Sequence, residues 1–297
     1  MRPMRFAICN EQFEGWAFDR ICQFVRSAGY EGLEVAPFTL APLITDVSPV
    51  QRAELKQQAA DAGIEILGLH WLLAKTQGFH LTSPDTEVRR RTAAYLVSLA
   101  EACHDLGGRL MVFGSPGQRS LLPGVTTERA FALASEVFRS AMPRMADVGV
   151  TLCMEPLSPA ETDFVNTCDD ARRLAEMVSH PNFLLHLDVK AMYSEHTPPT
   201  ELIRRYGSAA GHFHANDANR RGPGFGDVDF VPIFQALQDA GYDRWVSVEV
   251  FDYSPDPETI ARKSIEYMSN CRERVAAKTA AAGRATESGA RLGDAGS

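Results

Sequence analysis

The sequence predicts an α/β fold in which eight parallel strands close into a single (β/α)8 barrel. Eight short runs rich in Val, Ile, Leu and Phe recur along the chain, and each is followed by a longer segment of helical periodicity. The runs are almost continuously apolar, as expected of strands buried on both faces. The length of 297 residues suits one barrel of about 250 residues with a tail, although two domains of about 150 residues fit equally well.

The elements follow in a regular order. The expected strands cover residues 5–10, 32–37, 64–70, 109–115, 150–156, 183–190, 211–217 and 245–251. The expected helices cover residues 18–28, 48–62, 85–106, 126–147, 167–178, 229–240 and about 256–274. Thr167 and Asp229 are suitable N-caps, and glycines such as Gly29 and Gly241 provide left-handed stops. Eight such units leave no further run of strands, which favours the closed barrel.

A doubly wound open sheet is the alternative fold. It requires a glycine-rich GxGxxG turn after the first strand, and residues 9–16 read CNEQFEGW. We therefore expect a barrel domain over residues 1–275. Residues 276–297 are rich in Ala, Gly and Ser, with a single large apolar residue, Leu292, and this composition predicts a disordered tail.

Composition restricts the function classes. A net charge of −8 makes nucleic acid an unfavourable partner, because phosphate binding needs a basic face. No apolar run approaches the roughly 18 residues of a membrane span, and the N-terminus has no signal-peptide core, so we expect a cytoplasmic protein without a membrane partner. The six cysteines include no CxxC pair, and we expect them to be reduced and buried.

Polar residues mark the ends of four consecutive expected strands. Strands five to eight end with Glu155, Asp188, His214 and Glu249, each among apolar neighbours. Barrel strands present their carboxyl ends at one mouth, so these side chains should converge. Three buried carboxylates and an imidazole need compensating positive charge, and these donors favour Mn²⁺, with Mg²⁺ or Co²⁺ as alternatives, over structural zinc. The other interpretation is that the glutamates pair with Arg or Lys inside the barrel.

The positions of the two glutamates suggest a mechanism. Strands five and eight lie nearly opposite each other in a ring of eight, so Glu155 and Glu249 should flank a bound substrate. A cation that chelates a ketone oxygen and the neighbouring hydroxyl stabilises an enediolate. One glutamate can then remove the proton on carbon and the other can return a proton to the opposite face. This sequence of steps inverts a stereocentre.

Motifs on these four strands resemble a known family. The strings MEPLSP, HLDVKAM, HFHANDANRRGPGFGDVDF and VSVEVF, in this order, are similar to the sugar phosphate isomerase/epimerase family of xylose isomerase-like TIM barrels, which includes ketose 3-epimerases. The resemblance extends from the first strand to the last helix. It implies a small sugar substrate and metal binding by Glu155, Asp188, His214 and Glu249. It also implies acid–base roles for Glu155 and Glu249 and substrate contact by Arg220.

The chain departs from this family pattern at one position. Ketose 3-epimerases of the family usually carry a histidine three residues after the strand-six aspartate, where this chain has Ala191. The departure favours a different sugar or a sugar derivative over a free ketohexose. Related barrels epimerise 3-keto-glycosides or cleave them by β-elimination, in one case with a partner subunit, so both an epimerase and a lyase stay open. A homo-oligomer and a non-catalytic sugar-binding barrel are further alternatives.

A DNA-repair enzyme with the same barrel and a three-zinc cluster is the remote alternative. It needs several more His and Asp ligands at strand ends, including a histidine where Ala191 stands, and the chain is acidic. The sequence therefore disfavours an endonuclease IV-like function.

Further residues are candidate substrate contacts, each with a structural alternative. His70 and Trp71 end strand three, where they would supply a hydrogen-bond donor and a stacking platform, although His70 suits a structural role equally. Glu34 ends strand two and would hold a hydroxyl or a metal-bound water, or else pair with an arginine. Lys190 shares a strand face with Asp188 and would neutralise a developing oxyanion or pair with Glu155.

Three polar residues receive structural interpretations. His186 and His212 lie two residues before Asp188 and His214 on the same strand faces, one layer deeper, and we expect them to hydrogen-bond in the core. Arg119 lies in a Gly/Pro turn after strand four, where it would bind a phosphate or sugar or, as the favoured interpretation, point into solvent.

Overall fold

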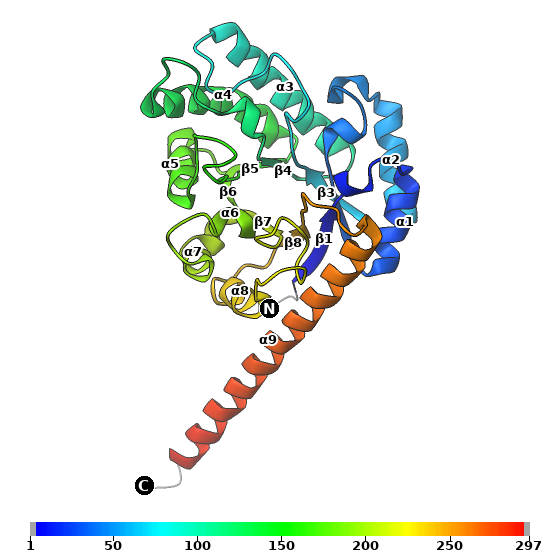
Figure 1. Ribbon diagram of the computed structural model, residues 1–297, viewed down its shortest axis with the longest axis vertical. Coiled ribbons are helices and arrows are strands. Elements are labelled where there is room, and N and C mark those ends of the chain that lie inside the picture. The colour runs from blue at the N-terminus through cyan, green and yellow to red at the C-terminus, as the bar shows by residue number, and fades with distance from the viewer. Residues whose placement is uncertain (1–3, 294–297) are drawn as a thin grey trace.

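Eight parallel strands form a closed barrel in the computed structural model, which describes residues 4–293. The strands pair in chain order, and the last pairs with the first. They are β1 (Arg5–Cys9), β2 (Gly32–Val35), β3 (Glu65–Leu69), β4 (Leu110–Phe113), β5 (Thr151–Met154), β6 (Phe183–Asp188), β7 (Ala210–Ala215) and β8 (Trp245–Val248). Figure 1 shows the strands inside a ring of helices. The predicted single (β/α)8 barrel is confirmed.

The helices begin and end close to the predicted residues. They are α1 (Phe18–Ala28), α2 (Pro49–Asp61), α3 (Thr86–Asp105), α4 (Thr127–Asp147), α5 (Cys168–Val178), α6 (Val189–Met192), α7 (Pro199–Tyr206), α8 (Phe230–Asp239) and α9 (Pro257–Gly293). The side chains of Thr167 and Asp229 accept backbone N–H groups at the starts of α5 and α8. Gly29, with φ of +112°, ends α1 in the left-handed conformation that glycine tolerates.

The structure differs from the predicted elements in two respects. The segment between β6 and β7 contains α6 and α7, which the sequence did not predict because one helical turn and an eight-residue helix give too little periodicity. Most strands also stop before the predicted ends. β5 ends at Met154 and β8 at Val248, so the backbone leaves the ladder just where Glu155 and Glu249 begin the loops at the barrel mouth.

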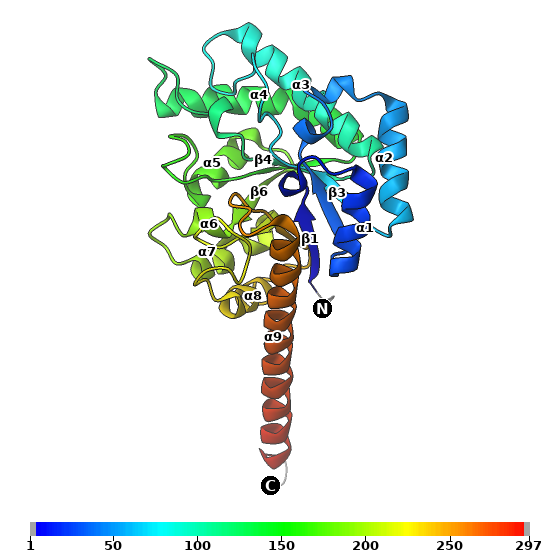
Figure 2. The ribbon, with the colours of Figure 1, turned by 45° about the vertical axis from the view of Figure 1, so that its right-hand side comes forward.

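α9 extends beyond the barrel, as Figures 1 and 2 show. Val275 is buried, whereas residues 276–280 are exposed. The helix continues through residues 276–293, which the composition assigned to a disordered tail. Ala, Arg, Lys and Glu have high helix propensity, so this segment can extend a helix whose preceding turns pack on the barrel. Residues 294–297 of the expected tail lie outside the described residues.

The barrel interior is polar beneath its mouth. Cys9, Glu34, His186, His212 and Ser247 are fully buried on five different strands. Branched apolar side chains usually fill such a barrel, so this polar layer marks the level at which a site can be built. All six cysteines are free and buried. Across residues 4–293, the structure contains no helix with the length and apolar character needed to cross a membrane.

Candidate active site

The four residues predicted as metal ligands lie at the carboxyl ends of β5 to β8. Glu155, Asp188, His214 and Glu249 are each at most 2% exposed. Ligand atoms of Glu155, Asp188 and His214 lie within 4.8 Å of one another, together with one of His186. Glu249 joins them through His214, whose Nδ1 lies 3.1 Å from its Oε2. The predicted convergence at one mouth is therefore present in the fold, with His186 as an additional member.

Two of these carboxylates lack enough positive charge around them. Burial and then the Glu249 and Asp188 carboxylates raise the pKa of Glu155 well above its usual value, and its Oε1 has no hydrogen-bond partner among the described residues. Burial also raises the pKa of Asp188, although Lys190 opposes the shift. Buried carboxylates in this state are stabilised by a cation. The donor set therefore fits a divalent metal ion.

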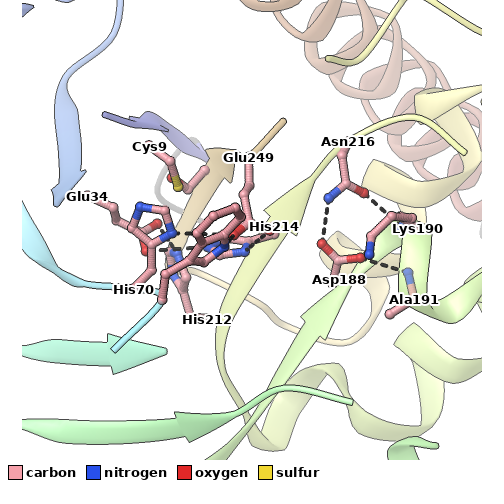
Figure 3. Close-up of polar contacts among 12 residues, drawn as sticks. Cys9, Glu34, His70, Asp188, Lys190, Ala191, His212, His214, Asn216 and Glu249 are labelled. Carbon is pink, nitrogen blue, oxygen red and sulfur yellow. Dashed lines mark hydrogen bonds and ion pairs between the residues drawn. The ribbon is translucent and has the colours of Figure 1, made fainter. Parts of the chain in front are cut away.

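Asp188 is held by two neutral donors, as Figure 3 shows. The Ala191 backbone N–H donates to its Oδ1 at 2.7 Å, and the Asn216 side chain donates to its Oδ2 at 2.5 Å. Ala191 is buried and places a methyl group where the family usually has an imidazole. The missing histidine is thus not replaced by another polar side chain at that position.

Glu249 has the opposite environment to Glu155. His70 Nδ1 and Trp71 Nε1 lie 3.3 and 2.6 Å from its Oε1, and His214 Nδ1 contacts its Oε2. Burial alone would raise the pKa of Glu249, but His214 and His70 outweigh burial and hold that pKa well below its usual value. Two glutamates in contrasting surroundings therefore face one cavity.

His186 differs from its expected core role. Neither of its ring nitrogens has a hydrogen-bond partner among the described residues, although the ring is fully buried. Burial and the neighbouring His214 and His212 hold the pKa of His186 well below its usual value, which leaves a neutral ring. Its position two residues before Asp188 was the only available signal, and that signal did not distinguish a ligand from a core residue.

A cavity of about 430 Å³ opens above these residues. Glu155 and Glu249 line it, and so do Trp71, Glu161, Arg220 and Phe251. The rings of Trp71 and Phe251 are stacked with centroids 5.8 Å apart, and Trp71 has an unusual φ of +50°. Trp71 and Arg220, which were predicted to contact a substrate, therefore both line this cavity. His70 does not line the cavity, because it is buried between Glu249 and Glu11, whose Oε2 lies 3.1 Å from His70 Nε2.

Lys190 points toward this cavity but pairs with an unpredicted residue. Its Nζ lies 2.7 Å from Glu161 Oε1 and 4.5 Å from the centroid of the Phe251 ring. Lys190 is therefore paired with Glu161 and not with Glu155, the partner that the sequence offered as an alternative. Burial lowers the pKa of Lys190, but Asp188 and Glu161 more than compensate and raise it. Glu161 lies in a loop without periodicity, so the sequence offered no signal for it.

Glu34 lies deeper than predicted. It does not line the cavity, and its carboxylate contacts His212 Nε2 at 2.5 Å and His214 Nε2 at 3.3 Å (Figure 3). Burial opposes ionisation, but the two histidines hold the pKa of Glu34 well below its usual value. The expected core hydrogen bond of His212 is therefore present. Neither of the two alternatives given for Glu34, a contact with substrate or metal-bound water and a pair with an arginine, is present, because its partners are two histidines.

Arg119 is buried rather than exposed. Its side chain is inaccessible to solvent and donates to the backbone carbonyls of Glu155 at 2.6 Å and Val165 at 3.1 Å. The expectation of a solvent-exposed arginine was wrong, because the loop after β5 folds over the turn after β4 and covers the guanidinium. Arg119 thereby fixes the backbone of Glu155 and the loop that carries Glu161.

Fold and site together define the class of the molecule, which is a TIM barrel with a cluster of buried carboxylates and histidines at its mouth. Its sequence matches the family of the xylose isomerase-like TIM barrel over residues 22–271. The chain belongs to this family, as its four strand-end motifs indicated.

Relatives of the chain are sugar epimerases. It is 30% identical over 233 residues to the D-psicose 3-epimerase of Ruminiclostridium cellulolyticum, with 76% of each chain covered. The fold is similar to a solved L-ribulose 3-epimerase, with a TM-score of 0.81, 21% identity and coverage of 94% of this chain and 98% of the other. It is also similar to a 3-keto-D-glucoside 4-epimerase from E. coli, with a TM-score of 0.79, 20% identity and coverage of 90% and 100%.

Proposed function

We propose that the protein is a divalent-metal-dependent sugar epimerase or isomerase that moves a proton on a carbon next to a carbonyl group. The kinship to a D-psicose 3-epimerase over three quarters of each chain supports a sugar substrate. The observation that carries the proposal is the pair Glu155 and Glu249. Both line one cavity, and they directly follow strands that are three steps apart in the ring.

The chain's own residues supply the proton chemistry. The Glu249 carboxylate is oriented by Trp71 Nε1 and His70 Nδ1, so it accepts the proton from carbon and leaves an enediolate. Glu155, which lines the same cavity from the opposite side, returns a proton to the opposite face. Glu155, Asp188, His214 and Glu249 would hold the metal ion, with Mn²⁺ preferred and Mg²⁺ or Co²⁺ as alternatives. When bound, the ion would polarise a substrate carbonyl.

Arg220, Lys190 and Trp71 would orient the sugar. Arg220 and Trp71 line the cavity, and the Lys190 ammonium reaches the Phe251 ring that lines it. A guanidinium donates several hydrogen bonds in a fixed fork, and an aromatic face suits the apolar side of a sugar ring. We place His70 behind Glu249, where it orients that carboxylate without touching the sugar.

Proton exchange tests the proposal. The Mn²⁺-loaded protein is incubated in D₂O with D-psicose, L-ribulose or a 3-keto-glucoside, and ¹H NMR follows the proton next to the carbonyl. We expect deuterium to replace this proton, exchange to stop after treatment with EDTA, and Mn²⁺ to restore it. Metal binding without exchange on any of these sugars would contradict the proposal and favour a sugar-binding barrel or one that needs a partner subunit.

A 3-keto-glycoside epimerase or lyase is the second candidate function. Ala191 favours it, because a buried methyl group occupies the place of the imidazole that contacts free ketoses in the family. The aromatic wall formed by Trp71 and Phe251 also offers a surface for a second sugar ring or an aglycone. Release of a free aglycone from a 3-keto-glucoside would identify the lyase, whereas an inverted 3-keto-glycoside would identify the epimerase.

Gly114 provides a test of the Glu155 position. A Cβ at this residue would lie 2.3 Å from Glu155 Oε2, so the carboxylate occupies space that only glycine leaves free. We expect Gly114→Ala to displace the Glu155 carboxylate and to weaken Mn²⁺ binding by about 10-fold or more, a loss typical of disturbed ligand orientation. Calorimetric Mn²⁺ titration measures this. Gly117→Ala in the same loop, where a Cβ would meet nothing within 4 Å, is the matched control.

A further inference from the structure

We propose that Glu34 is a positioning residue that fixes the ring of His214, so that His214 presents Nδ1 to the metal site. This inference rests on the proposed function. Glu34 belongs to β2, His214 belongs to β7, and both side chains are fully buried. Glu34 does not line the cavity, so any effect on the reaction passes through another residue.

The contacts of His214 determine which nitrogen is available. Its Nε2 lies 3.3 Å from Glu34 Oε2, and its Nδ1 lies 3.1 Å from Glu249 Oε2. A carboxylate only accepts hydrogen bonds, so Glu34 keeps a hydrogen on Nε2. The other nitrogen, Nδ1, lies on the side of the proposed ligand Glu249, where a bound cation would take the place of its hydrogen. Glu34 therefore selects the tautomer that can bind a cation.

A second histidine holds Glu34 in place. His212 Nε2 lies 2.5 Å from Glu34 Oε1, so each carboxylate oxygen faces one imidazole. The result is a chain of contacts from His212 through Glu34 to His214 and then to Glu249, which crosses the barrel from the polar layer to the mouth (Figure 3). Carboxylates that accept from a metal-ligating histidine orient its ring and increase its basicity.

The variant Glu34→Gln tests the assignment. A glutamine has one acceptor oxygen, so with that oxygen on His212 its NH₂ group faces His214 Nε2 and favours the wrong tautomer. We expect Mn²⁺ affinity to fall by about 10- to 100-fold, measured from the EPR signal of free Mn²⁺. Ser247→Ala is the matched control. Ser247 is equally buried in the same layer, and its hydroxyl hydrogen-bonds with Cys9, so the Mn²⁺ affinity of this variant should equal that of the wild type.

A second measurement needs no variant. A long-range ¹H–¹⁵N spectrum of the Mg²⁺-loaded wild-type protein shows which nitrogen of His214 carries the hydrogen. We expect it on Nε2, and a hydrogen on Nδ1 would overturn the assignment even if Glu34→Gln failed to fold.

Three outcomes of the titration separate this inference from the proposed function. Weaker Mn²⁺ binding by folded Glu34→Gln supports it. Wild-type Mn²⁺ affinity in a folded Glu34→Gln protein, even one with a lower unfolding temperature, would show that Glu34 only stabilises the fold. This outcome would overturn the inference but not the proposed function. A wild-type protein that binds no Mn²⁺ would overturn both the inference and the proposed function.

Discussion

Replacing Glu249 by glutamine is expected to reduce deuterium incorporation into the substrate by about 10²- to 10⁴-fold, the usual contribution of a general base. The glutamine keeps the shape of the side chain but cannot take a proton from carbon. Its single oxygen can also replace only one of the two carboxylate oxygens that lie beside Trp71 and His214 in the native residue. The exchange rate in D₂O, followed by NMR at saturating Mn²⁺, is the measurement.

The control for this variant uses the same substitution in the outer layer. Glu136 pairs with Arg89 on the helices outside the barrel and is distant from the mouth in the fold. Glu136→Gln should retain full exchange. Full exchange in metal-loaded Glu249→Gln would remove Glu249 from the role of base, and the proton would then have to leave toward another carboxylate.

The second large effect is expected at Asp188. Asp188→Asn should weaken Mn²⁺ binding by more than about 100-fold, because losing a ligand costs more than losing a residue that merely supports one. The introduced asparagine can still accept from the Ala191 N–H, but its NH₂ group would oppose the NH₂ group of Asn216. The unfolding temperature should therefore change far less than the affinity.

Asp229→Asn is the matched control for Asp188. Asp229 caps α8 as Asp188 caps α6, and asparagine caps helices about as well as aspartate does. Mn²⁺ titration of both variants compares the effect of the same Asp-to-Asn substitution on Mn²⁺ affinity at two helix N-termini. Equal and undiminished affinities would show that Asp188 only caps a helix turn, and they would contradict the proposed metal site.

The fold was predictable because its signals are local and repeated. Apolar runs separate the helices, and Thr167, Asp229 and Gly29 have the cap and stop conformations that their residue types favour. The elements α6 and α7 were missed because periodicity is weak over one or two turns. The extent of α9 could not be read from composition, because alanine-rich segments suit a helix as well as a disordered tail.

The candidate site was predictable only where strand ends determine it. Glu155, Asp188, His214 and Glu249 follow from the rule that strand ends meet at one mouth. The partners of these residues come from loops or from the opposite side of the barrel, as with Glu161 and Arg119. Their contacts depend on how loops fold over one another, which strand periodicity does not describe.

Trp71 performs two tasks with one side chain, and this has a consequence for altering selectivity. Its ring is part of the aromatic wall, while its indole N–H holds Glu249. Replacing Trp71 with a smaller residue would thus widen the cavity for bulkier substrates. The same change would remove the hydrogen bond that holds the Glu249 carboxylate in place beside the reacting carbon. Phe251, which lines the same cavity and stacks on Trp71 without holding Glu249 by a hydrogen bond, is the better position for redesign, because there breadth and reactivity are uncoupled.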